Sequence, residues 1–495
     1  MSNSRRALLT AAALGLALSG GANASAETLA EAIGLAYQTN PTLQQQRAQQ
    51  RALDESVVQA RVGYRPQVSV TGSVQYQDPV NGGLFNPDPD NFTATAGVGA
   101  SQPLYTGGRV TRGVQAAEAD VLRGRENLRA VEAQVLAGVI QAYVDVRRDQ
   151  EALRIRQENV QVLQRQLEEA SARFEVGEIT RTDVAQAEAR LAASQANLSA
   201  AQAQLSVSRA AYAAVVGQTP GTLEPEPALP GMPGSFDQAM DVAQDENPTL
   251  RASEFAEAAA RARVAQARAE YRPELSLRAN YGATTTFQAD NGPSGRFTDQ
   301  DAASATANVS VPLFTGGLNG SRVRQALENN NAALVAVEGA RREVLQRVSQ
   351  AWAQVISARA ALTANEEQVR AARIAAEGVR QEAQVGLRTT LDVLNAESEL
   401  REAELNLVRT RRDQYVAQAN LLSAMGRLEA EHLVADVEAY DPARNFNRVK
   451  NKGWVPWEPL VAGVDRVAAP PVRQPKPDLD APIDADLAKD TTPRR

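Results

Sequence analysis

Few side chains in this sequence could carry out acid–base, nucleophilic or metal chemistry. The 495 residues include one histidine, His432, and no cysteine. Catalytic triads of the serine or cysteine type need an imidazole base, and zinc clusters need several cysteine or histidine ligands. We therefore expect no catalytic site, no metal site and no bound cofactor. The formal charge of −7 also argues against a nucleic-acid partner.

Two related segments carry the polar residues best suited to binding or switching, and they are Val176–Val184 (VGEITRTDV) and Val385–Val393 (VGLRTTLDV). In each segment a glycine can end one helix, and a threonine followed three residues later by an aspartate can cap the next. A second role is also open, because copies of Asp392 could surround a symmetry axis. Charges about 10 Å apart repel by about 0.4 kcal/mol in water and about 1.7 kcal/mol at an effective dielectric of 20. Such a ring of carboxylates could bind a cation, but its mutual repulsion is too weak to hold apart the helix tips that carry it.

These segments belong to a tandem duplication. Three motifs occur twice in the same order: Asn-Pro-Thr-Leu at 40–43 and 247–250, Tyr-Arg-Pro at 64–66 and 271–273, and Pro-Leu-(Tyr/Phe)-Thr-Gly-Gly at 103–108 and 312–317. We expect a first repeat over residues 27–218 and a second over residues 235–433. The Pro-rich stretch 219–234 would link them.

Both ends of the chain differ from the repeats. Residues 1–26 read as a cleaved secretory signal, with Arg5 and Arg6 before a short apolar run and small residues at the cleavage site. Residues 434–495 are Pro-rich with mixed charge, and we expect a mostly disordered tail. The alternative is a docked tail that uses Trp454 and Trp457.

Long helices are expected in each repeat after a few short ones. Proline is absent there, good helix formers are frequent, and apolar residues recur every seven positions, as at Val139, Val146 and Leu153. This period predicts coiled-coil packing of helices at about 109–175, 181–217, 318–385 and 390–427. The first would be roughly 100 Å long at about 1.5 Å per residue. Such a length suits a bridge or a tube wall.

Between the Tyr-Arg-Pro and Pro-Leu motifs of each repeat, apolar residues recur at every second position. This period predicts strand pairs at about 67–102 and 274–311. Each run has the length of a tilted transmembrane strand. Four strands do not close a barrel, and an open edge in lipid leaves backbone groups unpaired at a cost of several kcal/mol each. Chains would therefore have to share a barrel, with eight strands from two chains or twelve from three. The alternative is a soluble β-sandwich, in which one face of each sheet is exposed to solvent.

The ordered set of motifs, present twice, resembles the TolC family of outer-membrane efflux and type I secretion channels over about residues 27–433. The resemblance implies a mixed α and membrane-β fold, in which a homotrimer forms a 12-stranded β-barrel and an α-helical tunnel. It implies a passive exit duct, not an enzyme, in outer-membrane lipid with its tunnel in the periplasm. The implied partners are a periplasmic adaptor (membrane fusion protein) and an inner-membrane pump of the ABC, RND or MFS type. Without a lipid-anchor cysteine, the chain is more similar to unlipidated members.

The same resemblance assigns roles to the two tip segments. Thr182, Asp183 and Arg388 match gate residues, and Asp392 matches an acidic selectivity ring. The implied adaptor-docking residues are Val176, Gly177, Val385, Gly386 and Leu387. Ala383 and Asn395 stand where the family pattern has a gate tyrosine and a second ring acid, so we expect a weaker latch and a single acidic ring.

A periplasmic coiled-coil adaptor without a pore is the competing interpretation. Adaptors also contain long helical hairpins, but typically one per chain. Two in-phase repeats with paired strands favour the duct. The sequence does not identify the cargo or the pump.

Overall fold

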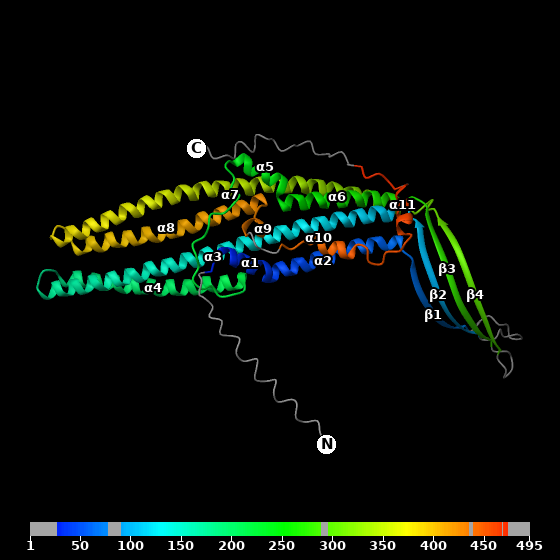
Figure 1. Cartoon of the computed structure of the whole chain (residues 1–495), viewed down its shortest axis with the longest axis horizontal. Helices are drawn as coiled ribbons and strands as arrows, with labels where there is room; N and C mark the ends of the chain where they lie inside the picture. The colour runs from blue at the N-terminus through cyan, green and yellow to red at the C-terminus, as the bar shows by residue number, and fades with distance from the viewer. Residues whose placement is uncertain (1–26, 78–90, 289–295, 435–438, 468, 474–495) are drawn as a thin grey trace, which may run out of the picture.

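The computed structural model describes residues 27–77, 91–288, 296–434, 439–467 and 469–473, so the expected signal at 1–26 lies outside the described residues. Long helices run along one axis, and a β-sheet extends from one end (Figure 1). The first half contains α1 (Leu29–Thr39), α2 (Pro41–Arg61), η1 (Val62–Tyr64), β1 (Gln67–Gln77), β2 (Asn91–Tyr105), α3 (Arg109–Glu175) and α4 (Arg181–Val216). The second contains α5 (Phe236–Glu246), α6 (Pro248–Ala269), β3 (Glu274–Gln288), β4 (Arg296–Ser310), α7 (Leu318–Gln384) and α8 (Thr390–Met425). They are followed by α9 (Ala430–Leu433), α10 (Pro442–Val449) and α11 (Glu458–Val467).

The repeated Asn-Pro-Thr-Leu motif starts a helix and ties it to another. The Asn40 side-chain oxygen accepts hydrogen bonds from the N–H groups of Thr42 and Leu43, and Pro41 occupies the first helical position. The Asn40 side-chain NH₂ donates to the carbonyl of Val215 at the end of α4. Asn247 makes the equivalent contacts with α6 and with Ala424 in α8. The motif therefore joins each short helix to its long hairpin.

The helical hairpins pair α3 with α4 and α7 with α8. Val139 and Val146 on α3 and Val348 and Val355 on α7 are buried, at the positions of the seven-residue apolar repeat. Among the helices in the described part of the chain, none is long and apolar enough to cross a lipid bilayer.

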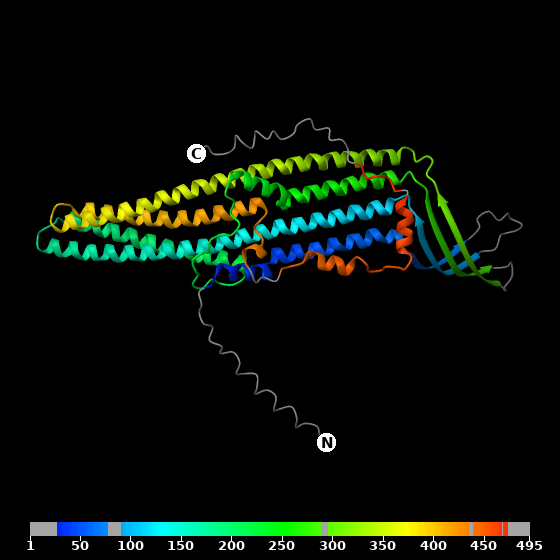
Figure 2. The same cartoon turned by 45° about the horizontal axis from the view of Figure 1, so that its top comes forward.

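The four strands form one open antiparallel sheet in the order β1-β2-β3-β4. The pairing of β2 with β3 joins the two halves of the chain. The helices α2, α3, α6 and α7 form a layer in the same order as the strands to which they connect (Figure 2). In a single chain, both the sheet and this layer therefore end in open edges.

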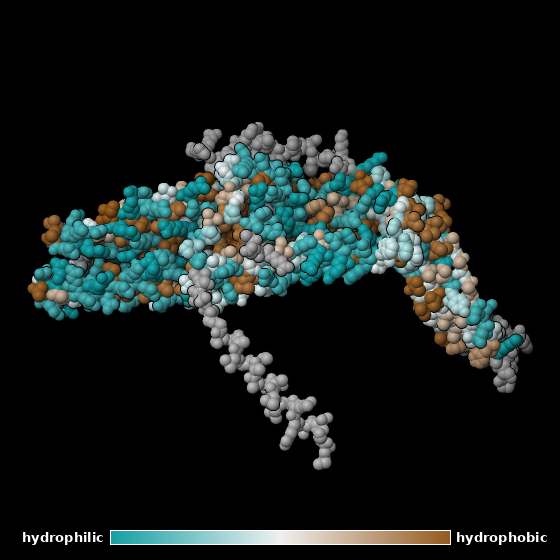
Figure 3. Space-filling view, in the orientation of Figure 1, coloured by the Kyte–Doolittle hydropathy of each residue, from teal (hydrophilic) through white to brown (hydrophobic). Residues whose placement is uncertain are grey.

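The register places the apolar residues of all four strands on one face of the sheet, which we call the apolar face. One row across the sheet runs Val70, Val98, Tyr281 and Ala303, and an aromatic row near the loops runs Tyr76, Phe92, Phe287 and Phe297. Asp299 and Asp301 interrupt this face toward the loop end of β4. The opposite face is rich in Ser, Thr, Gly and Asn. Both faces of β1 and β4 are exposed, and apolar side chains are visible over the strands (Figure 3).

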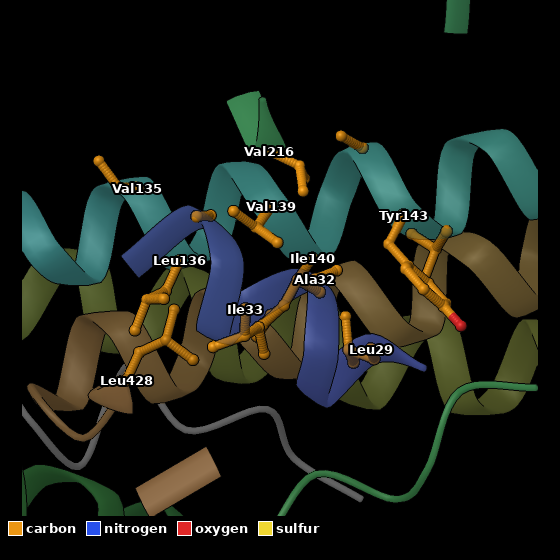
Figure 4. Close-up of a cluster of buried hydrophobic side chains, with 14 of the residues drawn as sticks. Leu29, Ala32, Ile33, Val135, Leu136, Val139, Ile140, Tyr143, Val216 and Leu428 are labelled. Atoms are coloured by element: carbon orange, nitrogen blue, oxygen red, sulfur yellow. The ribbon is translucent and has the colours of Figure 1, made fainter. Parts of the chain in front are cut away.

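The largest core lies where α1 packs into the middle of the first hairpin. Ile33 lies against α3 beside Leu136 and Ile140, while Leu428 from the end of the second repeat closes one side (Figure 4). The Tyr143 hydroxyl lies 2.9 and 2.8 Å from the carbonyl oxygens of Glu27 and Glu224, which share its one proton. The segment 219–234 contains no helix and is held to the bundle at such points.

The expectation of a mostly disordered tail is wrong for residues 439–467 and 469–473. Helix α10 packs against α2, and α11 packs against β2 and the start of α3. Arg65 forms a buried ion pair with Glu458, at 2.9 Å between Nε and Oε2. Composition alone suggested disorder because acids in a Pro-rich stretch resemble solvated charges. In the structure the two acids of α11, Glu458 and Asp465, each have a buried partner instead.

The buried carboxylate of Asp465 provides the cap that α3 lacks locally. Gly108 precedes α3 and has no side chain to cap it. Asp465 Oδ1 accepts hydrogen bonds from the N–H groups of Thr106 and Gly108 at 2.8 and 3.0 Å, and Oδ2 accepts from the Thr111 hydroxyl at 2.7 Å. The equivalent start of α7 has no such cap among the described residues, and Leu313 and Phe314 beside it are exposed. The tail thus makes the two repeats unequal.

Candidate functional site

The two helix tips lie at the end of the molecule farthest from the sheet (Figure 1). Gly177 and Gly386 adopt φ of +82° and +83°, the left-handed conformation that favours glycine, and each turns the chain from one long helix into the next. Beside them, Val176, Val385 and Leu387 are 72%, 71% and 75% exposed. Each tip therefore presents apolar side chains to solvent.

Each tip also contains a complete capping box. The Asp183 carboxylate accepts hydrogen bonds from the Thr180 N–H and hydroxyl, at 3.0 and 2.8 Å, and the Thr180 hydroxyl oxygen accepts from the Asp183 N–H. Thr389 and Asp392 repeat these contacts. The threonine hydroxyl, followed by the backbone N–H, lowers the pKa of both aspartates. Both therefore stay ionised at neutral pH while they cap a helix.

The structure separates the four expected gate and ring residues into two groups. Thr182 and Asp183 lie on the first tip, and Arg388 and Asp392 lie on the second. Arg388 Nε donates to Glu382 Oε2 at 2.7 Å, which raises the pKa of Arg388. No hydrogen bond or ion pair joins Arg388 to Thr182 or Asp183 among the described residues of a single chain.

Other contacts link the two hairpins on the side toward the tips, and sequence reasoning, which singled out Asn395, did not identify its partner or the other contact. Arg190 on α4 donates to the side-chain oxygen of Asn395 on α8 at 3.1 Å, and Arg401 lies 3.9 Å from Glu158. Pairs between hairpins have no fixed sequence spacing, so only the fold reveals them. The spacing of Glu397 and Arg401 was readable, because residues four apart face each other on a helix.

Both departures from the family pattern lie at this junction. Asn395 accepts the hydrogen bond from Arg190. Ala383 lines a cavity of about 130 Å³ between the tips, together with residues of α3, α7 and α8 that include Arg173, Arg380 and Thr390. A small residue at 383 leaves this space open, and the amide at 395 accepts a hydrogen bond from the charged Arg190 without forming an ion pair.

The described residues offer no alternative reactive centre. No group of three or more His, Asp or Glu side chains in this part of the chain could hold a metal ion. His432 is exposed on α9, and its Nδ1 lies 3.6 Å from Glu429 Oε2. The chemistry of the tips is therefore that of hydrogen bonds, charge and exposed apolar surface.

Comparison with known proteins identifies the family. The family model described as "Outer membrane efflux protein" matches residues 32–218 and 239–427. The chain is 36% identical over 448 residues to "Outer membrane efflux protein BepC" of Brucella suis biovar 1 (strain 1330), across 90% of this chain and 95% of that protein. It is 30% identical over 420 residues to "Outer membrane protein TolC" of Vibrio cholerae serotype O1, across 84% of this chain and 94% of that protein.

A solved structure shows the same fold. The outer membrane protein VceC of Vibrio cholerae superposes with a TM-score of 0.67 at 22% identity, across 80% of this chain and 96% of that one. With both repeats matched by one family model, the chain belongs to the outer membrane efflux protein family and is a protein of the outer membrane.

Proposed function

We propose that three copies of this chain form one 12-stranded β-barrel, continued by an α-helical tunnel, and that the assembly is a passive exit duct. The observation that carries this proposal is the open four-stranded sheet with one apolar and one polar face. Its edges at β1 and β4 would leave backbone N–H and C=O groups unpaired in lipid, which costs several kcal/mol for each group. Pairing β4 of one copy with β1 of the next removes that cost.

Three copies fit a duct better than two. A barrel of about eight strands is filled by its own side chains, whereas a larger one can leave a water path. With the apolar face toward lipid, the small polar residues of the other face, such as Ser69, Thr95 and Ser304, would line the lumen. The helices α2, α3, α6 and α7 lie side by side in the same order as the strands to which they connect. The symmetry that closes the sheet into a barrel would therefore also close this helical layer into a tunnel.

In this assembly the helix tips form the periplasmic mouth. Thr182, Asp183 and Arg388 would act as the gate, and three copies of Asp392 as the acidic selectivity ring. The exposed apolar tip residues Val176, Val385 and Leu387, with Gly177 and Gly386, would receive a periplasmic adaptor. The adaptor would connect the duct to an inner-membrane pump of the ABC, RND or MFS type.

The family match favours the duct over the adaptor interpretation, and we propose no catalytic activity for this chain. The Brucella relative is named for efflux, and we propose export in this broad sense for this chain. A passive wall selects cargo weakly, so the pump would set the choice between small molecules and polypeptides.

Conductance of the purified mature protein in a planar bilayer tests the proposal. We expect small, cation-selective openings that divalent cations on the periplasmic side reduce, and a mass of three chains in detergent. A protein that stays soluble without detergent and never inserts, or that is dimeric, would contradict the proposed duct.

A further inference from the structure

Helix α11 has an unusual position and orientation. It lies at the junction of the sheet with the helical bundle and runs crosswise to the long helices (Figure 2). If the strands cross a membrane, a helix placed this way lies nearly parallel to the membrane plane. This is the orientation of interfacial helices, which rest on a membrane without spanning it.

Helix α11 differs from an ordinary surface helix because its buried face holds two acids beside the apolar Val461, while its exposed face is apolar. Its inner face carries Glu458 and Asp465, both buried against Arg65 and the start of α3. Its outer face carries Leu460, Val464 and Val467, which are 72%, 56% and 89% exposed. Spacings of four and three residues place these side chains in one stripe along the helix. This stripe is unpartnered in the single chain.

Trp457 connects that stripe to the apolar face of the sheet. Its indole Nε1 donates to Gln102 Oε1 at 3.1 Å. Gln102 pairs in register with Leu277, which belongs to the apolar face and is exposed. Trp457, which comes just before the stripe on α11, therefore lies beside the end of the apolar face.

The exposed charged residues of the segment that follows Asp441 and contains α11 are basic, although the whole chain is acidic. Two of them, Arg444 and Arg448, lie on α10, which packs against α2. Between residues 442 and 473 the acids are Glu458 and Asp465, and both are buried with partners. The exposed basic residues in the same stretch are Arg444, Arg448, Lys452, Arg466 and Arg473. Phospholipid surfaces with anionic headgroups attract such a segment and also accept its apolar stripe. An acidic surface of a second chain would match the charge but not the stripe, and a neutral apolar surface would match the stripe but not the charge.

The spacing along the strands matches a membrane. Ten residues of β2 separate Gln102, beside Trp457, from Phe92 in the aromatic row near the loops. Ten residues span about 33 Å of strand, which gives roughly 25 Å of height at a tilt of about 40°. That is about the height of the apolar band of outer-membrane barrels, which aromatic residues flank on both sides.

We propose that α11 and the segment before it, residues 450–467, form an interfacial anchor that lies on the anionic phospholipid surface at the periplasmic side of the outer membrane. Leu460, Val464 and Val467 enter the headgroup–acyl boundary, and Lys452 and Arg466 contact phosphate groups. The inference rests on the proposed function, because it requires the apolar face of the sheet to meet lipid.

Site-directed fluorescence on the full mature chain tests the anchor. The chain has no cysteine, so single-cysteine variants can be labelled with an environment-sensitive dye and reconstituted in vesicles. Leu460→Cys reports on α11, Val70→Cys reports on the apolar face, and Val207→Cys, exposed on α4, is the control outside the membrane. We expect phospholipids brominated in the upper acyl chain to quench the dye at 460 about as strongly as at 70, and not at 207.

The lipid composition tests the charge. Quenching at position 460 should rise when phosphatidylglycerol replaces part of the phosphatidylcholine, and Lys452→Gln combined with Arg466→Gln should abolish that rise. No response to phosphatidylglycerol would overturn the anionic-surface assignment.

The three positions separate the possible failures. Quenching at 70 but not at 460 would overturn the anchor and leave the duct intact. If the dye at 460 were in addition shielded from aqueous iodide, a second copy or another protein would cover the stripe, and the anchor would again be wrong. Absence of quenching at both 70 and 460 would mean that the sheet does not meet lipid, and the proposed function would fall with the anchor.

Discussion

Asp183 and Asp392 show how one local structure can serve two roles. Both accept the same hydrogen bonds from a threonine hydroxyl and N–H, and both have a lowered pKa for that reason. A lowered folded-state pKa means that the cap contributes stability above the ordinary aspartate pKa and loses it as the pH falls through the lowered value. The caps alone therefore explain both residues at the local level, and a further role for Asp392 depends on where symmetry places it.

The ring role predicts a difference between two matched variants. Asp392→Asn keeps an oxygen for the cap but removes the charge, and it should lower the cation preference of the open channel by roughly two- to eighteenfold, the range allowed by about 0.4–1.7 kcal/mol. Asp183→Asn makes the same chemical change on the other tip and should leave the preference unchanged. Reversal potentials in a salt gradient measure both. Equal losses would remove the special role of Asp392.

The lowered pKa of Asp392 gives a pH test of the same ring. Because its hydrogen bonds favour the carboxylate, cation preference should persist through mildly acidic solution and fail only below the ordinary aspartate range. The measurement is the reversal potential at successive pH values. A loss of preference near neutral pH would show that another group carries the selectivity.

Arg388 makes a local ion pair with Glu382, so its gate role requires a second contact in the assembly. If that contact holds the mouth closed, Arg388→Ala should raise the leak conductance, by about fivefold at most for an exposed charge pair. Glu382→Ala frees the same arginine and should not raise it. Single-channel recording distinguishes the two variants, and a leak that rises equally in both would show that only the local ion pair matters.

At the scale of elements, the tail changes a duplicated chain into an unequal one. The two Tyr-Arg-Pro motifs are identical, but only Arg65 of the first lies against α11, through Glu458 and the carbonyl of Lys452. Asp465 caps α3, and the described residues hold no counterpart at α7. Burial by itself would raise the pKa of Asp465, but hydrogen bonds from Thr111, Gly108 and Thr106 outweigh it and lower the pKa. The carboxylate therefore stays ionised, and this contact stays intact in mildly acidic solution.

The tail contact predicts unequal effects of equivalent substitutions. Arg65→Ala leaves Glu458 as a buried unpaired charge and should cost about 3–5 kcal/mol of docking free energy. Arg272→Ala, the same change in the second repeat, should leave the tail docked. The rate of trypsin cleavage after Lys450 and Lys452 measures docking. Similar cleavage of both variants would show that Glu458 does not hold the tail.

At the scale of the whole molecule, the proposed assembly would cover surfaces that a single chain leaves open. Its sheet is exposed on both faces and unpaired at both edges, and its helical layer is equally open. An extended apolar face of this kind on an exported protein needs lipid or protein to cover it. The two faces of one strand should therefore respond differently to charge.

Val70 and Ser69 are neighbours on opposite faces of β1, and both are exposed. Val70→Arg would place a charge toward lipid and should destabilise the inserted state by about 2 kcal/mol or more for each chain. Ser69→Arg would point toward the water-filled lumen and should insert normally. Insertion yield in vesicles and the denaturant midpoint of the inserted protein measure both. Loss of insertion in the Ser69 variant alone would reverse the assignment of the faces.

Much of the architecture follows from short-range patterns. The seven-residue apolar period indicates long helices because seven residues are close to two helical turns. Helices α3 and α7 cover those residues. The period of two indicates strands, because alternate side chains face opposite sides of a sheet. Thr180 and Asp183 are readable as a cap because both partners lie within one turn.

Contacts between distant residues were beyond the reach of those patterns. Arg190 with Asn395, and Arg65 with Glu458, join residues from different repeats or from a repeat and the tail. A charged residue in a polar stretch looks the same whether it faces water or a buried partner, so the sequence favoured a disordered tail and left the docked tail as the alternative. The sequence by itself determined which residues form helices, strands and caps, because those depend on neighbours along the chain. Only the tertiary structure decided which charges meet and which apolar surfaces stay open, because both depend on how the elements pack in space.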